Sequence, residues 1–281
     1  MLNTKIKHKL SVCLLLKDNE NYLPFMKETF DNLDHLFDTE YFLYENNSTD
    51  NTKFTMVEFM KTRKGLCIME NNKAPCFPSG ISLKRGTHMA SIRNKLKNIH
   101  GSLSSEFTLL LDTDVIFDPR CVEKLIENIK YEQTVAISPF SVYFDKNKTF
   151  DPSNFHYYDS FAFISEKGVS WDETGNTCQF KCCKQCSSQR KNLGRRDPEL
   201  LENKLMYVDS AFGGLFIIKT HAFNLVEWGN SICEHHSFCK NVRKFGPIVM
   251  DGSTFICNTE IKCGEPEYTK MTEIIKQLNS F

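Results

Sequence analysis

The sequence has no excess charge of either sign, because Lys plus Arg and Asp plus Glu each number 35 among its 281 residues. A balanced chain has no overall field that would favour nucleic acid, so we expect no nucleic-acid partner and a ligand that binds at a local site. No apolar run approaches the roughly 20 residues that a membrane helix needs, so we expect no integral membrane segment. The N-terminal apolar patch is short and has no small-residue cleavage site, which is untypical of a signal peptide.

Cysteine, in contrast, is abundant, with 12 in the chain. Single cysteines in or beside apolar segments are expected to behave as small hydrophobic residues. The stretch "CQFKCCKQC" is different, and it is compatible with a zinc site, a disulfide knot or a cysteine-rich loop. The apparently unpaired cysteines favour a reducing cytoplasm, with the secretory-pathway lumen as the alternative if an anchor is missing from this chain. Five cysteines lie singly in or beside apolar segments, namely Cys13, Cys67, Cys76, Cys121 and Cys257, and the cluster contains Cys178, Cys182, Cys183 and Cys186.

Hydrophobic periodicity divides the first half of the chain into alternating strands and helices. Short apolar runs predict buried strands, and apolar residues spaced three and four apart predict helices. This alternation predicts the α/β class, with a mostly parallel central sheet between helices. We expect strands at 9–17, 40–45, 65–70, 106–112 and 134–144, and helices at 23–37, after the turn at 46–52, at 89–99 and at 122–129.

The second half is less regular. Residues 145–206 carry aromatic residues, the cysteine cluster and a polar run, which predicts an inserted loop region and a candidate lid. A strand over 206–220 and a C-terminal helix over 271–278 follow. Because no repeat or linker divides the chain, we expect a single domain over 1–281. Its parts are a regular half at 8–145, an irregular half with the cysteine-rich insertion at 146–265, and a C-terminal helix at 266–281.

Two aspartates follow the apolar run of "LLLDTDVIFDP", residues 109–119. Residues i and i+2 of a strand point the same way, and the carboxyl ends of parallel strands form the crevice where open α/β sheets bind ligands. Two like charges there are costly unless a cation lies between them. Asp112 and Asp114 therefore suit a hard divalent cation that is shared with substrate phosphates. The alternative is a pair of turn aspartates that cap the following helix.

Two enzyme classes use a D-x-D after an apolar strand. In the haloacid-dehalogenase-like phosphatases, whose pattern D-x-D-x-[TV] matches "DTDV", the first aspartate is a nucleophile, a role that would fall on Asp112. That class begins its fold with the motif, whereas over 100 residues precede it here and no convincing acidic pair follows it. The other class comprises the nucleotide-sugar-dependent glycosyltransferases of the GT-A fold.

A second motif favours the glycosyltransferases. The stretch "FLYENNSTDNT" (42–52) resembles the "VDDGSTDGT" turn of family 2 glycosyltransferases, from which it departs at 45–47. The resemblance implies that Glu45, Asn47 and Asp50 belong to the nucleotide site, with the Glu45 carboxylate accepting hydrogen bonds from the ribose or the base. Taken alone, the stretch is equally typical of a helix-capping turn.

Two further stretches fit this resemblance. "RGTHMASIRNKL" (85–96) looks like the A-x-x-R-N helix that precedes the D-x-D in these enzymes, which makes Arg85 and Arg93 available to a diphosphate. The alternative is an exposed cationic helix face. "HYYDSFAF" (156–163), together with the order of the other motifs, resembles family 69, the fungal capsule-associated α-1,3-mannosyltransferases. That likeness is loose and covers roughly residues 10 to 240.

The last constellation joins "VDSAFGGLFIIKT" (208–220) and "SICEHHSFC" (231–239). It resembles the acceptor-side glycine loop and the x-E-D motif of GT-A enzymes. The resemblance implies catalytic roles for Asp209 and Glu234, with Glu234 taking the proton of the acceptor hydroxyl, and it lets His236, or alternatively His235, complete the metal site. The alternatives are a capping aspartate, a glycine bulge and ordinary surface histidines.

The resemblance implies a GT-A glycosyltransferase that uses Mn²⁺ or Mg²⁺ and a UDP- or GDP-linked sugar donor. The donor would bind to the half at 8–145, with its diphosphate on a metal held by Asp112 and Asp114. A glycan, a protein-linked glycan or another hydroxyl acceptor would bind to the half at 146–265. The rivals are the phosphatase described above and a non-catalytic sugar- or nucleotide-binding protein of the same fold. Donor sugar, stereochemistry and oligomeric state do not follow from these motifs.

Overall fold

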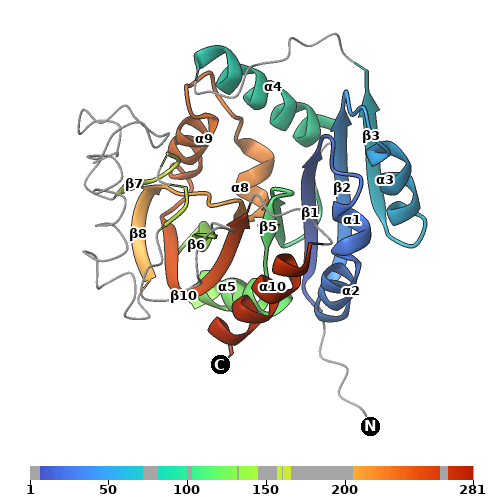
Figure 1. The fold of residues 1–281 in the computed structure, drawn as a ribbon. Helices are drawn as coiled ribbons and strands as arrows, with labels where there is room; N and C mark the ends of the chain where they lie inside the picture. Colours follow the sequence, from blue (N-terminus) through green and yellow to red (C-terminus); the bar gives the residue numbers. More distant parts are fainter. Residues whose placement is uncertain are drawn as a thin grey trace, which may run out of the picture.

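The computed structural model describes residues 7–71, 82–99, 103–131, 133–144, 157–159, 161–165, 205–259 and 265–280. A 10-stranded sheet runs through the described part of the chain (Figure 1). Along the sheet the strands follow the order β3-β2-β1-β4-β9-β6-β10-β8-β7, and β5 pairs with β10 off this path. The sheet is mixed, and its first four strands are parallel.

The first half of the chain alternates between strands and helices as its periodicity predicts. β1 and β4 are almost entirely buried, which is typical of parallel strands covered on both faces. The predicted helix at 23–37 is broken at Met26 into α1 and α2. The elements are β1 (Lys9–Leu16), α1 (Tyr22–Phe25), α2 (Lys27–Leu36), β2 (Asp38–Asn46), α3 (Thr52–Met60), β3 (Gly65–Glu70), α4 (Leu83–Ile99), β4 (Phe107–Leu111), β5 (Val115–Ile116), α5 (Pro119–Tyr131) and β6 (Ala136–Phe144).

The second half returns to the same sheet with antiparallel strands. β9 lies between β4 and β6 and is antiparallel to both. β10 runs parallel to β6 and antiparallel to β8. The described elements are β7 (Ile164–Ser165), β8 (Leu205–Ser210), β9 (Leu215–Lys219), α8 (Thr220–Leu225), α9 (Glu234–Val242), β10 (Ile248–Thr259) and α10 (Pro266–Leu278).

Two differences from the predicted elements concern this half. The single strand expected over 206–220 is wrong, because β8 and β9 are separate strands that do not pair with each other. The residues between them include Gly213 and Gly214, whose φ angles of 66° and 87° lie in the left-handed region and turn the chain. β10 was not predicted at all, although it is the longest strand described.

Two tyrosines of β2, Tyr41 and Tyr44, show that helices cover both faces of the sheet. The Tyr41 hydroxyl donates to Asp34 of α2 at 2.7 Å. The Tyr44 hydroxyl donates to Glu70 at 2.7 Å, and Glu70 also accepts a hydrogen bond from Lys95 of α4. Because side chains three residues apart in a strand lie on opposite faces, α2 and α4 cover opposite faces. The fold is therefore the three-layer α/β arrangement that the sequence predicts.

The carboxyl ends of the parallel strands meet at one edge. In the sheet register Leu16 of β1 lies beside Glu45 of β2, and Leu14 of β1 lies beside Leu111 of β4. The loop after β1, the turn after β2 and the D-T-D motif after β4 therefore emerge together. Among the described helices, none is both long and apolar enough to cross a bilayer. Most of the loop region predicted at 145–206, including the cluster from Cys178 to Cys186, lies outside the described residues.

Candidate active site

The D-T-D motif directly follows β4, whose residues are all buried. The Asp112 N–H donates to the Gly214 carbonyl at 2.8 Å, and Thr113 Oγ1 donates to Asn19 Oδ1 at 2.9 Å. The motif is thus fixed from two sides, by the loop before β9 and by the loop after β1. Asp112 is half-buried and Asp114 is exposed, so a ligand can reach both carboxylates.

Arg93 forms an ion pair with Asp112, and no ion pair of Asp114 is found in the described part of the chain. Burial raises the pKa of Asp112 above its usual value, although the Arg93 guanidinium opposes the rise. Burial and the negative charge of Asp112 raise the pKa of Asp114 to about 7. The Asp114 side chain itself remains open to solvent. A cation bound to both carboxylates would lower both pKa values.

A buried cluster next to Asp112 joins α4 to α9. Arg93 Nη2 donates to Asp112 Oδ1 at 3.2 Å, and Arg93 Nε donates to Glu234 Oε1 at 3.4 Å. His235 Nε2 lies 3.4 Å from Arg93 Nη2 and 3.5 Å from Glu234 Oε1. The structure therefore brings together three of the predicted site residues, Asp112, Arg93 and Glu234, although they are far apart in the sequence.

The charge states in this cluster follow from its burial. The His235 ring stacks on Phe212 with 3.8 Å between centroids. Burial lowers the pKa of His235 to about 3, so its ring is neutral near pH 7. Burial raises the pKa of Glu234, His235 and Arg93 lower it, and the net change is a decrease. Because His235 is neutral near pH 7, its charge does not contribute to that decrease there, and the ion-pair partner of Glu234 at that pH is the Arg93 guanidinium, 3.4 Å away.

Glu45 lies at the end of β2 with a fully buried carboxylate. Its Oε1 accepts a hydrogen bond from the Ser48 N–H at 2.6 Å. Its Oε2 is buried without a hydrogen-bond partner, and the nearest ammonium among its ion pairs, Lys53 Nζ, is 3.8 Å away. A buried carboxylate oxygen with no donor is unusual and marks a place where a ligand donor can bind. Asn47 follows with a left-handed φ of 58°.

Asp50 has a different environment from Glu45. Its carboxylate accepts hydrogen bonds from the Thr52 N–H at 3.0 Å, from Thr52 Oγ1, and from the Glu20 N–H at 3.1 Å. Asn19 and Asp18 add further bonds to the same turn, the N–H of Asn19 donating to Thr52 Oγ1 and Asp18 Oδ1 accepting from the Thr49 N–H. Asp50 is therefore occupied in tying the loop after β1 to the turn before α3.

Asp159 is a carboxylate that the residue-level predictions missed. It accepts hydrogen bonds from the Gly213 N–H at 2.9 Å and from the Ala162 N–H at 3.2 Å. Burial raises its pKa to about 6, and the charges of Asp112 and Glu234 add to that rise. Asp159 thus belongs to the same electrostatic group as these two residues. The sequence signal was present in "HYYDSFAF", but nothing local indicates that it meets the glycine turn.

The remaining predicted residues are more scattered. Arg85 is exposed in the first turn of α4, and its charge acts on Asp112. Asp209 of β8 forms an ion pair with Arg243 at 2.6 Å, and no contact with the Asp112 group is found for it among the described residues. The His236 ring lies 6.0 Å from that of Phe161.

Metal binding by the protein alone requires several His, Cys, Asp or Glu side chains close together. No set of three or more His, Cys, Asp or Glu side chains in the described ranges is arranged to hold a metal, so His236 is not grouped with Asp112 and Asp114. This leaves the two aspartates as the protein ligands to be considered. Six of the cysteines are free thiols in the described part of the chain, namely Cys13, Cys67, Cys121, Cys233, Cys239 and Cys257.

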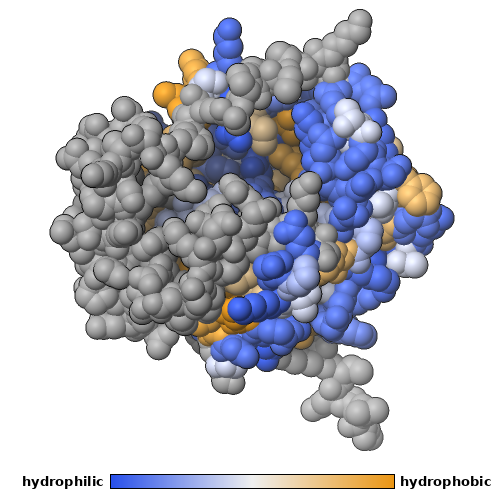
Figure 2. Space-filling view, in the orientation of Figure 1, coloured by the Kyte–Doolittle hydropathy of each residue, from blue (hydrophilic) through white to orange (hydrophobic). Residues whose placement is uncertain are grey.

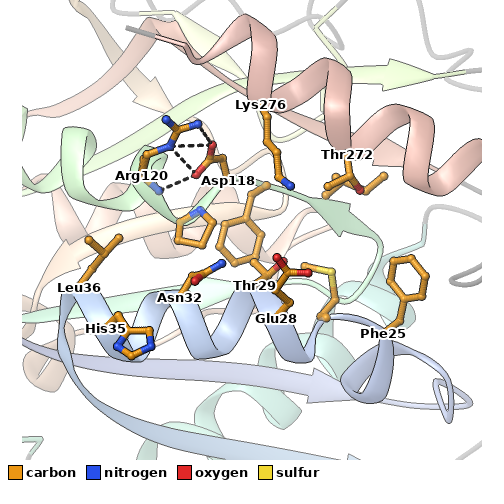
Figure 3. Close-up of a pocket in the computed structure, with 14 residues that line it drawn as sticks. Phe25, Glu28, Thr29, Asn32, His35, Leu36, Asp118, Arg120, Thr272 and Lys276 are labelled. Atoms are coloured by element: carbon orange, nitrogen blue, oxygen red, sulfur yellow. Dashed lines mark hydrogen bonds and ion pairs between the residues drawn. The ribbon is translucent and has the colours of Figure 1, made fainter.

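Figure 2 shows the face of the molecule hollowed below α4, between α9 and the strands β1 and β2. A separate cavity of about 380 Å³ lies between α2, α10 and the start of α5. The side chains of Glu28 and Asn32 on α2 and of Lys276 on α10 extend toward it (Figure 3). Its lining contains none of the predicted site residues, so we place the candidate site at the Asp112 edge and not in this cavity.

Comparison with known proteins gives a likeness in structure only. No family model matches the chain, and no curated protein matches its sequence significantly. The mannosyltransferase PcManGT from Pyrobaculum calidifontis, solved with GDP-Man and Mn²⁺, is 11% identical with a TM-score of 0.51, over 95% of this chain and 60% of that one. GalNAc-T7, solved with UDP, GalNAc and Mn²⁺, is 12% identical with a TM-score of 0.53, over 90% of this chain and 43% of that one.

The chain thus spans about half the length of these two glycosyltransferases. At such low identity the likeness establishes the fold and leaves the chemistry to be argued from the residues. The protein therefore has the α/β fold of the GT-A glycosyltransferases.

Proposed function

We propose that the protein is a metal-dependent glycosyltransferase that moves a sugar from a nucleoside diphosphate sugar to a hydroxyl of a glycan or another acceptor. The observation that carries this proposal is the convergence of Glu45, Asp112 and Asp114 at the carboxyl edge of three parallel strands. This edge is where open α/β sheets bind nucleotides. The GT-A fold supports the proposal without determining the reaction.

The donor nucleotide has a place beside β2 in this proposal. The Oε2 of Glu45 has an ion pair with Lys53 but no hydrogen-bond donor, and it would accept hydrogen bonds from the ribose hydroxyls or from a base N–H once the turn that buries it opens. Asn47 lies in the same turn with its strained φ, which is typical of residues at binding sites. Arg85, exposed at the start of α4, is the cation that we assign to the diphosphate.

Asp112 and Asp114 fit a divalent metal by the charge around them. Asp112 pairs with Arg93, but no ion pair of Asp114 is found among the described residues, so negative charge that a divalent cation could offset remains at the motif. Mg²⁺ and similar ions in nucleotide sites commonly take only one or two protein carboxylates, the substrate phosphates and water supplying the rest, so a third protein ligand is not required. Such a metal, when bound, neutralises the charge that develops on the leaving diphosphate.

The acceptor side has two carboxylates in this proposal. Glu234 is ionised but buried and held by Arg93, and its lowered pKa makes it a weak base. Asp159 is less buried, and its pKa of about 6 suits it better to take a proton from a hydroxyl near neutral pH. We therefore include Asp159 beside Glu234 as a candidate for contact with the acceptor. Asp209, paired with Arg243, has weaker support.

Release of nucleoside diphosphate tests the proposal. The protein is incubated with Mn²⁺ and a panel of UDP- and GDP-linked sugars, with and without simple glycan acceptors. We expect release with a subset of donors, and its loss in Asp114→Ala. Asp38→Ala is the matched control, because Asp38 lies at the amino end of β2, away from the carboxyl ends of the parallel strands. Among the described residues its ion pair is with Lys64.

The same samples distinguish the rival functions. Phosphate release from phosphomonoesters without dependence on a nucleotide would support the phosphatase with Asp112 as nucleophile and would contradict the transferase. Metal-dependent binding of a sugar nucleotide that is never turned over would favour a non-catalytic binding protein. No binding and no release with any donor would overturn the proposed function.

A further inference from the structure

Arg93 is a buried charged residue whose environment does not match a simple phosphate-binding role. It lies on α4 and is 7% exposed, whereas Arg85 on the same helix is exposed. Arginine is almost never this deeply buried unless it is paired. The partners of Arg93 therefore indicate what it does.

Two of the three guanidinium nitrogens, Nε and Nη2, make polar contacts with other described residues. Nη2 contacts Asp112 Oδ1 and His235 Nε2, and Nε contacts Glu234 Oε1. The Phe212 ring lies 5.1 Å from the guanidinium carbon, and His235 stacks on that same ring. The planar fork is thus held by an aromatic ring and by three polar groups, which leaves it little freedom.

These contacts connect the two halves of the chain. Arg93 and Asp112 come from the half with the D-T-D motif, and Phe212, Glu234 and His235 come from the later half. The neutral ring of His235 accepts a hydrogen bond from Nη2 without adding a second positive charge. One guanidinium therefore sets the distance between a carboxylate on the donor side and a carboxylate on the acceptor side.

We propose that Arg93 is a positioning residue that fixes Asp112 relative to Glu234, and that it is not the residue that binds the donor diphosphate. This inference rests on the proposed function, because it assigns the two carboxylates to the donor and acceptor sides of one reaction. Lysine keeps the charge but cannot contact both carboxylates through separate nitrogens. Arg93→Lys therefore tests the bridging geometry separately from the charge.

The experiment measures turnover and donor binding for the wild type, Arg93→Lys and Arg85→Gln. For Arg93→Lys we expect kcat to fall about 100-fold, the scale of a misplacement of roughly 1 Å, while the affinity for UDP or GDP in EDTA stays within about threefold of the wild-type value. For Arg85→Gln we expect the affinity for UDP or GDP to fall, in EDTA as well as in Mn²⁺, with a smaller effect on UMP or GMP. Intact donor binding also shows that Arg93→Lys is folded.

Chemical rescue adds a variant that does not depend on lysine. Guanidinium ions added to Arg93→Ala should restore part of kcat, and ethylammonium ions should not, because only a planar fork spans both carboxylates. A loss of UDP or GDP affinity in EDTA with kcat unchanged in Arg93→Lys would show direct diphosphate contact and overturn the inference. Wild-type kinetics in Arg93→Lys would also overturn it. If the wild type itself releases no nucleotide, the proposed function fails and the inference fails with it.

Discussion

At the scale of single residues, the candidate site is distinguished by several carboxylates with raised pKa values around one buried arginine. Asp112, Asp114 and Asp159 all have pKa values above the usual range, and Arg93 is the buried cation among them. Perturbed carboxylates gathered at one place are typical of functional sites, because structural charges are usually paired. Burial raises the pKa of these carboxylates and lowers that of His235, which is therefore neutral near pH 7. The neutral His235 leads to a prediction that can be tested without a substrate.

Replacing His235 should remove a pH dependence of stability. The folded pKa of His235 is about 3, and the ordinary value is 6.5. Below pH 6.5 the unfolded chain therefore binds a proton that the folded protein excludes, and the free energy of unfolding falls as the pH falls from 6.5 toward 3. Between pH 6.5 and pH 5 this loss amounts to about 2 kcal/mol.

The measurement is the free energy of unfolding in urea at pH 5 and pH 7 for the wild type and His235→Asn. We expect the variant to lose less stability than the wild type between these two pH values, whatever its stability at pH 7. His8→Asn is a control at a partly exposed histidine that pairs with Glu106 on the surface. Equal pH slopes in the wild type and His235→Asn would contradict a buried neutral histidine.

Gly214 gives a prediction about backbone geometry next to the D-T-D motif. A Cβ at this position would lie 2.5 Å from Val115 Cγ2 and 2.8 Å from Asn258 Nδ2, at a φ of 87°. Gly214→Ala should lower the free energy of unfolding by about 1 to 2 kcal/mol from the left-handed conformation alone. It should also displace Val115 and so weaken Mn²⁺ binding at the adjacent Asp114.

Mn²⁺ affinity and urea unfolding check this prediction. Gly229→Ala is the matched control, because φ at Gly229 is not left-handed and the added methyl group meets only Ser237, at 3.2 Å. We expect this control to retain Mn²⁺ affinity. If Gly214→Ala binds Mn²⁺ as the wild type does, the glycine turn does not hold the motif in place.

How far single residues could be predicted depends on the range of their contacts. Asp112 and Asp114 were found because an apolar strand and the i, i+2 spacing are local features. Asp159 was not singled out, because its partner Gly213 is far away in the sequence. The bridge made by Arg93 was hidden for the same reason, and its motif suggested a phosphate contact instead.

At the scale of elements, the α/β alternation of the first half was predictable because each parallel strand is a continuous apolar run. β10 was not among the predicted strands, and its sequence contains Asp, Gly, Ser and Thr at 251–254, residue types that are common in turns. In the structure that stretch forms an irregularity within the strand, where the register shifts between Asp251 and Phe255 and Asp251 accepts the Ser253 N–H. The two strands β8 and β9 were merged because the left-handed pair at Gly213 and Gly214 has no effect on hydrophobic periodicity.

Hydrogen bonds join the loop after β1 to the turn after β2, and Asp50 accepts one of them from the Glu20 N–H. Replacing Asp50 therefore tests whether these bonds stabilise the fold. Asp50→Ala removes acceptors for the N–H groups of Thr52 and Glu20, so we expect the free energy of unfolding to fall by about 1 to 2 kcal/mol. Burial raises the pKa of Asp50, but the hydrogen bonds from Thr52 and Glu20 outweigh it and hold the pKa below the usual value. This stabilisation is therefore present above pH 4 and is lost as the pH falls further.

Urea unfolding and nucleotide titration separate this role from direct nucleotide contact. Glu58→Ala is the control on α3, the helix that follows this turn, because the ion pair of Glu58 among the described residues is an exposed one with Lys61, and its loss should change stability by less than about 0.5 kcal/mol. We expect Asp50→Ala to lose stability at pH 7. Unchanged stability together with a large loss of nucleotide affinity would show that Asp50 contacts the nucleotide directly.

At the scale of the whole molecule, the candidate site lies where the two halves of the sheet join. β9, from the later half, inserts between β4 and β6 of the first half, and its preceding turn holds the D-T-D motif. A ligand that engages both Glu45 and the motif would therefore contact three strand ends and the turn before β9 at once. Such a ligand should stabilise the fold as a whole, since it binds the native arrangement and not the unfolded chain.

Thermal unfolding with nucleotides measures this effect. With Mn²⁺ and a nucleoside diphosphate at about 100 times Kd, the stabilisation is about 2.7 kcal/mol, which for a chain of this size corresponds to a rise in Tm of about 5 °C or more. UDP and GDP are compared with ADP, and Mn²⁺ with EDTA. We expect the rise to require both the metal and one preferred base. It should be lost in Asp114→Asn, which removes a metal ligand, and reduced in Glu45→Gln, which changes the acceptor for the ribose or base, but not in Asp38→Asn. A protein whose Tm no nucleoside diphosphate raises in Mn²⁺ would have no donor site at this edge, because binding of that strength to the native state must raise Tm.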